Sequence, residues 1–164
     1  MAFNSILKNI RILLLDPERD RADYTREVLN GAGLYSVRTA RDSNVAVDML
    51  VGSQFDVALV ELGPKDTKGR DFLRILRDPK SSPARNLPVL AMLPAATRED
   101  VRVVIRLGVD HVLIRPFSAN DVLNRLESVS KSPAPRHESE DYIGPDRRRV
   151  PDQYYQGTKR RTQD

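Results

Sequence analysis

The sequence predicts an α/β protein in which a doubly wound parallel sheet is built from five strand–helix units, (βα)5. Three short runs, residues 10–16, 55–62 and 88–93, are almost continuously apolar, as strands covered on both faces are. The segments between the runs carry apolar residues at helical spacing. Short connections and right-handed crossovers then place helices on both faces of the sheet.

The first elements follow from apolar spacing and glycine punctuation. The run IRILLLD at 10–16 predicts the first buried strand and ends at an acid. Residues 20–30 place apolar side chains on one helical face, and Gly31 and Gly33 end that helix. Residues 35–40 alternate as a short second strand.

The middle of the chain repeats the same unit. Asp42 or Ser43 can cap a second helix, because both side chains accept hydrogen bonds from a first helical turn. The run FDVALVEL at 55–62 predicts the third strand and again carries an acid near its end. Residues 69–77 predict the third helix.

The last elements complete the alternation. Residues 88–93 predict a fourth strand. Thr97 caps the helix that follows, and Gly108 closes it. Residues 111–115 predict the fifth strand and 118–131 the final helix. We therefore expect the compact domain to end near residue 131.

Composition limits the function classes. The chain has 164 residues, no cysteine and a net charge of +4. It therefore has no disulfides or cysteine nucleophile, and it leans toward anionic partners. No apolar run is long enough to span a bilayer and no secretion signal is visible, so we expect a cytoplasmic protein. No nucleophile–base pair, glycine-rich phosphate loop or metal cluster is apparent, so we expect neither an enzyme nor a metal site.

The order of elements comes with three further features: an acid after the first strand, an acid at the end of the third, and Arg-Pro-Phe after the fifth. Together they resemble the receiver domain of bacterial response regulators, a flavodoxin-like fold found in CheY. The resemblance covers about residues 10–131 and implies a receiver-like domain at 1–131. In that family, two acids after the first strand hold magnesium and an aspartate ending the third strand accepts a phosphoryl group. A Ser or Thr follows the fourth strand, and Lys-Pro follows the fifth.

Carried over by position, the phosphorylation site of this chain is degenerate. Asp16 is kept, but Pro17 stands at the second acid and Glu61 at the phosphoacceptor. Leu93 replaces the Ser or Thr, and Arg115 replaces the lysine. Magnesium requires several oxygen ligands, and leucine cannot hydrogen-bond a phosphoryl oxygen. We therefore expect no phosphorylation. The resemblance also implies a cis bond between Arg115 and its proline.

Two interpretations of Glu61 follow from its position. Glu61 is either a residue that drifted at a lost site, or a carboxylate that reaches Arg115 and imitates the phosphorylated state. An ion pair there would supply one negative charge, against nearly two for a phosphoryl group.

A different composition begins after the last helix. Residues 132–141 predict a Pro/Ser-rich linker, and 142–164 predict an arginine-rich tail that is disordered without a ligand. The arginine run in GPDRRR offers planar forks that fit phosphate or the O6/N7 edge of guanine. Single carboxylates can accept from the N1 and N2 hydrogens of guanine, and tyrosine faces stack on purines. A compact anionic ligand with guanine bases fits this set.

A degenerate receiver joined to such a tail resembles the CheY-like cyclic-di-GMP effectors, the Cle family. The resemblance implies that the tail binds cyclic-di-GMP, as a stacked pair of ligand molecules. It also implies that the ligand-bound protein acts on a FliM-like flagellar motor switch protein at the flagellated cell pole. Motility and surface attachment would be controlled in this way. The residues implied in cyclic-di-GMP binding are Arg136, Tyr142, Asp146, Arg147, Arg148, Asp152 and Tyr155.

Other interpretations of the tail stay open on the residues alone. A basic C-terminal run is often simply solvated, or it binds nucleic acid without base preference. The runner-up function is a pseudo-receiver adaptor whose tail binds a protein or nucleic acid. Dependence on guanine would separate the first interpretation from these.

Overall fold

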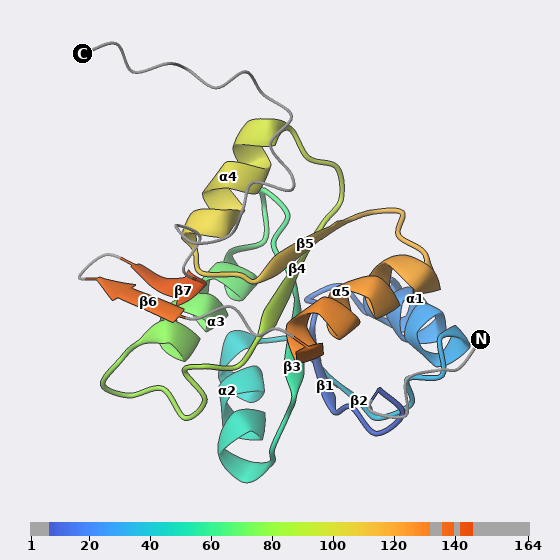
Figure 1. Ribbon diagram of the computed structural model, residues 1–164, viewed down its shortest axis with the longest axis horizontal. Coiled ribbons are helices and arrows are strands. Elements are labelled where there is room, and N and C mark those ends of the chain that lie inside the picture. Colours follow the sequence, from blue (N-terminus) through green and yellow to red (C-terminus); the bar gives the residue numbers. More distant parts are fainter. Residues whose placement is uncertain (1–6, 132–135, 140–141, 146–164) are drawn as a thin grey trace.

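The computed structural model describes residues 7–131, 136–139 and 142–145. Five parallel strands form one sheet in the order β2-β1-β3-β4-β5, with helices on both faces (Figure 1). The strands are β1 (Ile12–Leu15), β2 (Val37–Ala40), β3 (Val57–Glu61), β4 (Val89–Leu93) and β5 (His111–Ile114). The helices are α1 (Arg19–Gly31), α2 (Ser43–Gly52), α3 (Thr67–Arg77), α4 (Arg98–Arg106) and α5 (Ala119–Lys131). The predicted doubly wound (βα)5 fold is confirmed.

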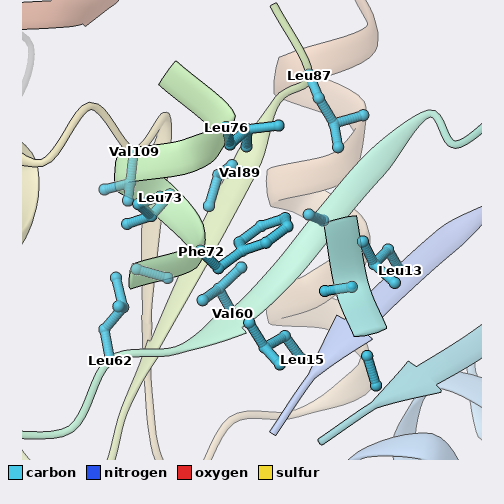
Figure 2. Close-up of a cluster of buried hydrophobic side chains, with 14 of the residues drawn as sticks. Leu13, Leu15, Val60, Leu62, Phe72, Leu73, Leu76, Leu87, Val89 and Val109 are labelled. Carbon is cyan, nitrogen blue, oxygen red and sulfur yellow. The ribbon is translucent and has the colours of Figure 1, made fainter. Parts of the chain in front are cut away.

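The side chains of the interior strand β1 alternate between two separate hydrophobic cores, one on each face of the sheet. Leu13 and Leu15 point into the core that α2, α3 and α4 cover, around the fully buried Phe72 (Figure 2). Ile12 and Leu14 point into the opposite core, which α1 and α5 cover (Figure 1). Because both faces of β1 are buried, its sequence is continuously apolar rather than alternating.

The helix ends show why the predicted caps lie where they do. Asp42, rather than Ser43, is the N-cap of α2, and its side chain accepts from the backbone N–H of Asn44. Thr97 begins α4 with a complete capping box, as predicted. Gly108 follows α4 with a φ of 88°, which is the left-handed region that glycine adopts without strain.

The extension contains two short strands. β6 (Arg136–Ser139) and β7 (Tyr142–Pro145) pair as an antiparallel two-stranded sheet, with Arg136 opposite Pro145 (Figure 1). The linker expected at 132–141 and the tail expected at 142–164 to be disordered without a ligand stay predictions, because most of their residues lie outside the described ranges. The polar sequence of β6 lacks the apolar alternation that marks a strand, because its pairing rests on backbone hydrogen bonds to β7.

Candidate functional site: a salt-bridged receiver pocket and a paired extension

The four residues assigned to the degenerate site meet at one edge of the sheet. Asp16 directly follows β1, Glu61 ends β3, Leu93 ends β4 and Arg115 directly follows β5. Parallel strands present their carboxyl ends on a common edge, which is where α/β folds place their sites. Backbone pairing brings Arg115 beside Leu93, because the N–H of Arg115 donates to the Leu93 carbonyl at 2.8 Å.

Arg115 binds Glu61 directly. Its Nη2 and Nε lie 3.0 and 3.2 Å from the same oxygen, Oε2 of Glu61. Nη2 also donates to the hydroxyl of Thr25 at 3.1 Å and lies 3.6 Å from Asp16 Oδ2. The ion pair that the second interpretation of Glu61 requires is therefore present. Imitation of a phosphoryl group remains a prediction. The Arg115–Pro116 bond is cis, as the resemblance implied.

The ion pair between Arg115 and Glu61 is largely shielded from solvent. Both Asp16 and Glu61 are fully buried, and only 13% of the Arg115 side chain is exposed. Burial raises the pKa of Glu61, while the charges of Arg115 and Arg21 oppose the rise. The second carboxylate oxygen, Oε1, is buried without a hydrogen-bond partner in the described part of the chain. Glu61 therefore has one oxygen that is hydrogen-bonded to Arg115 and one that is buried without a hydrogen-bond partner among the described residues.

The cluster of Asp16, Glu61 and Arg115 is called the pocket below. A second arginine, which sequence reasoning missed, also belongs to it. Arg21 lies on the first turns of α1 and grips Asp16 with two nitrogens, Nη2 to Oδ1 at 2.7 Å and Nε to Oδ2 at 2.8 Å. The same guanidinium lies 3.5 Å from Asp66 Oδ2 and 3.7 Å from Glu61 Oε2. The hydrogen bonds with Asp16 raise the pKa of Arg21, so it stays charged. The available signal was its spacing of five residues from Asp16.

A close glycine contact holds the floor of the pocket in place. Gly69, in the first turn of α3, lies so near β3 that a Cβ built on it would sit 2.2 Å from the carbonyl oxygen of Glu61. Only a residue without a side chain permits this approach. A Cβ on Gly63 would likewise fall 2.8 Å from Asp66 Oδ2 and 3.4 Å from Glu61 Oε1, which locates both carboxylates close to that loop glycine.

These residues do not fit the magnesium ion that the receiver fold implies. Asp16 has both oxygens bound by Arg21, Glu61 Oε2 is bound by Arg115, and Pro17 supplies no side-chain ligand. Within the described ranges, no group of three or more His, Cys, Asp or Glu side chains is arranged to hold a metal ion. Leu93 is apolar and 2% exposed, so it offers no hydroxyl to a phosphoryl oxygen. The pocket is filled by internal salt bridges.

The residues assigned to ligand binding are only partly described. Arg136 lies in β6 and Tyr142 in β7, and the pairing of these strands brings Arg136 opposite Pro145. Backbone atoms of Gly144 and Pro145 belong to a buried stretch at the end of β7. The other predicted ligand contacts, Asp146, Arg147, Arg148, Asp152 and Tyr155, lie outside the described residues.

The strand order, the edge position of the pocket and the helix on each side define a receiver-type signalling domain. The response regulator receiver domain family matches residues 12–127, and the chain belongs to this family. It is thus a CheY-like response-regulator receiver signalling protein.

Individual relatives are distant but cover the same domain. Chemotaxis protein CheY-3 of Vibrio cholerae is 25% identical over 122 residues, covering 74% of this chain and 92% of the relative. Chemotaxis protein CheY of Pseudomonas aeruginosa is 24% identical over 120 residues, covering 73% of this chain and 95% of the relative. Among solved structures, Vibrio cholerae chemotaxis protein CheY4 has a TM-score of 0.62 at 22% identity, covering 73% of this chain and 98% of that one.

Each of these three proteins covers 74% or less of this chain. In the described part of the chain, no helix is both long and apolar enough to cross a membrane.

Proposed function

We propose that this protein is a non-enzymatic cyclic-di-GMP effector whose arginine-rich extension binds the dinucleotide and whose receiver domain carries the signal to a protein partner. The observation that carries the proposal is the strand pairing in the extension. Arg136 lies opposite Pro145, and Pro145 directly precedes Asp146, Arg147 and Arg148 in the chain. Arg136 is thereby placed opposite the last described residue before the Asp-Arg-Arg segment.

The residue types support a guanine-containing ligand over a simple polyanion. Arg147 and Arg148 supply forks for phosphate or for the O6/N7 edge of guanine, and Arg136 adds a third guanidinium from the paired strand. Asp146 and Asp152 would repel a plain phosphate backbone, but a carboxylate can accept from the N1 and N2 hydrogens of guanine. Tyr142 and Tyr155 supply stacking faces.

The receiver pocket supports a signal that does not depend on phosphorylation. Asp16 and Glu61 are engaged by Arg21 and Arg115, and Leu93 cannot contact a phosphoryl group. A ligand that binds the extension would replace that input. If residues beyond Pro145 become ordered on binding, charge-assisted hydrogen bonds to the ligand would offset the conformational entropy that they lose.

The partner that we propose is a FliM-like flagellar motor switch protein. The chemotaxis proteins among the relatives share this domain, and the resemblance to the Cle family implies the motor switch as the partner. Control of motility and surface attachment from the cytoplasm, with recruitment to the flagellated pole, then follows as part of the proposal.

Titration calorimetry of the full chain with cyclic-di-GMP, GTP and a short DNA duplex tests the ligand. We expect saturable binding of cyclic-di-GMP alone. Binding of DNA with a steep salt dependence and no preference for cyclic-di-GMP would favour the nucleic-acid alternative. Failure of all three ligands would contradict the proposal and favour an adaptor whose tail binds a protein.

Variants separate guanine recognition from charge attraction. Arg147→Ala or Arg148→Ala should weaken cyclic-di-GMP binding about tenfold to a hundredfold, because a charge-assisted hydrogen bond contributes about 1.5–3 kcal/mol. Arg149→Ala removes the same charge from the same run and serves as the matched control, with a smaller expected effect.

Asp152→Ala is the sharper variant because it makes the tail more positive. If Asp152 reads a guanine edge, the variant should bind cyclic-di-GMP more weakly and discriminate less against cyclic-di-AMP. Tighter binding of both dinucleotides by the variant would contradict guanine recognition and leave the tail as an electrostatic tether.

A further inference from the structure

The pocket at the carboxyl edge of the sheet holds two cations among its acids. Asp16, Glu61 and Asp66 converge there, and each lies within 4 Å of the Arg21 guanidinium. Arg115 provides the second positive charge, 3.0 Å from Glu61 and 3.6 Å from Asp16. We infer that Arg21 is a built-in counter-cation that takes the place of the receiver family's divalent metal and excludes that metal from the pocket.

Arg21 is the shared cation of several carboxylates rather than one half of an isolated surface ion pair. Its guanidinium lies 2.7 Å from Asp16, 3.5 Å from Asp66 and 3.7 Å from Glu61. Glu18, at 3.3 Å, is the fourth carboxylate within 4 Å of this one cation. Only 24% of its side chain is exposed. An exposed, isolated pair would be screened by solvent, but a partly buried pair on a fully buried Asp16 is screened much less.

Arg21 also leaves no oxygen of Asp16 free for a metal. Nη2 of Arg21 binds Oδ1 and Nε binds Oδ2, while Oδ1 accepts a further hydrogen bond from the backbone N–H of Glu18 at 3.0 Å. A divalent ion would have to displace the guanidinium to reach this carboxylate. Because both cations require the same oxygens, binding of the metal and the observed position of Arg21 exclude each other.

A buried oxygen shows that the acids retain a capacity to bind a cation. Glu61 Oε1 is fully buried and has no hydrogen-bond partner in the described ranges. Magnesium prefers carboxylate oxygens. Removal of Arg21 would leave Asp66 without this cation, and Asp16 and Glu61 with Arg115 alone of the two arginines. We therefore expect the pocket to require a replacement cation when Arg21 is lost.

This inference goes beyond the proposed function, because it concerns the receiver pocket and not the dinucleotide. The test is a Mn²⁺ titration of the full chain, followed by electron paramagnetic resonance of the free ion and without any nucleotide. Wild-type protein should show no saturable Mn²⁺ binding at the pocket. Arg21→Ala should bind one Mn²⁺ with an affinity at least about tenfold higher than that of wild type, since an unbalanced carboxylate cluster attracts a divalent ion.

Matched variants assign the signal to the pocket. Arg19→Ala removes an exposed arginine two residues away on the same helix, which pairs with the exposed Asp23 at 3.8 Å. This control should behave like wild type. The double variant Arg21→Ala with Asp16→Asn should lose the Mn²⁺ site that Arg21→Ala gained, and Mg²⁺ should compete with Mn²⁺ in the single variant.

Stability provides a second measurement. Arg21→Ala should melt at a lower temperature than Arg19→Ala, and millimolar Mg²⁺ should restore part of that loss where NaCl of equal ionic strength does not. If Arg21→Ala does not fold in the absence of metal, recovery of folding by Mg²⁺ or Mn²⁺ supports the inference, and the absence of recovery contradicts it. Equal Mn²⁺ affinity of wild type and Arg21→Ala, or a folded Arg21→Ala that binds no Mn²⁺, overturns it.

Discussion

Gly69→Ala should destabilise the domain by pushing α3 away from the candidate site. A Cβ at this position would lie 2.2 Å from the carbonyl oxygen of Glu61, 2.8 Å from Leu62 Cδ2 and 3.0 Å from Val60 Cγ1. The first of these atoms belongs to the backbone of a central strand, so it cannot rotate away as the end of a side chain could. Relief requires a shift of the helix, the strand or both.

The magnitude follows from two opposing terms. Overpacking of a core costs about 1–3 kcal/mol, and a contact with a fixed backbone atom belongs at the upper end or above. Alanine in place of glycine within a helix gains about 1 kcal/mol. We therefore expect a net loss of about 2 kcal/mol or more in the free energy of unfolding, which lowers the urea midpoint by about 1 M at a typical slope.

The matched control is Gly52→Ala, at the last residue of α2. A Cβ there would meet nothing within 4 Å, so the control should change stability by no more than about 1 kcal/mol. Urea unfolding followed by circular dichroism measures both variants. A Gly69→Ala protein as stable as Gly52→Ala would refute the claim that close packing at Gly69 holds Glu61 in place.

Three further predictions concern the ion pairs, the lost phosphorylation site and a helix cap. The guanidinium of Arg11 keeps the pKa of Asp56 below its ordinary value of 3.8, so this pair stabilises the fold above that pH and the contribution is lost as pH falls through the lowered pKa. The stability difference between wild type and Asp56→Asn should therefore be constant at neutral pH and shrink below about pH 4. Incubation with magnesium and acetyl phosphate should add no phosphoryl group by mass spectrometry, and a stoichiometric adduct lost on mutating Asp16 or Glu61 would show that the pocket is still active. Thr97→Ala should lower the free energy of unfolding by about 1 kcal/mol through loss of the α4 cap, and Thr97→Ser should retain most of it.

The agreement between expectation and structure is greatest where a local pattern suffices. Continuous apolar runs marked β1, β3 and β4, because strands covered on both faces need no polar side chains. Predicted strand ends extended past the observed ones, as in residues 10–16 against Ile12–Leu15. The flanking residues Arg11 and Asp16 still exchange backbone hydrogen bonds with the neighbouring strands, so the strand has no sharp end that composition could mark.

The site was partly predictable because the receiver resemblance assigns residues by position. Asp16, Glu61, Leu93 and Arg115 were carried over from that resemblance, and parallel strands bring residues at their carboxyl ends to one edge. The Glu61–Arg115 contact follows from that placement and from opposite charge. Arg21 was not assigned, because a charged residue near the start of a helix is usually solvated and its spacing does not reveal which way the side chain points.

The sequence by itself determined the order of strands and helices, the replacement of the receiver family's phosphorylation residues and the residue types of the extension. These properties depend on periodicity and on the identity of single side chains. Only the tertiary structure decided that Arg21 enters the acid pocket and that Arg136 lies opposite Pro145. Both depend on how separate segments approach one another, and the energies of such contacts depend on distance and burial, which no local pattern in the chain encodes.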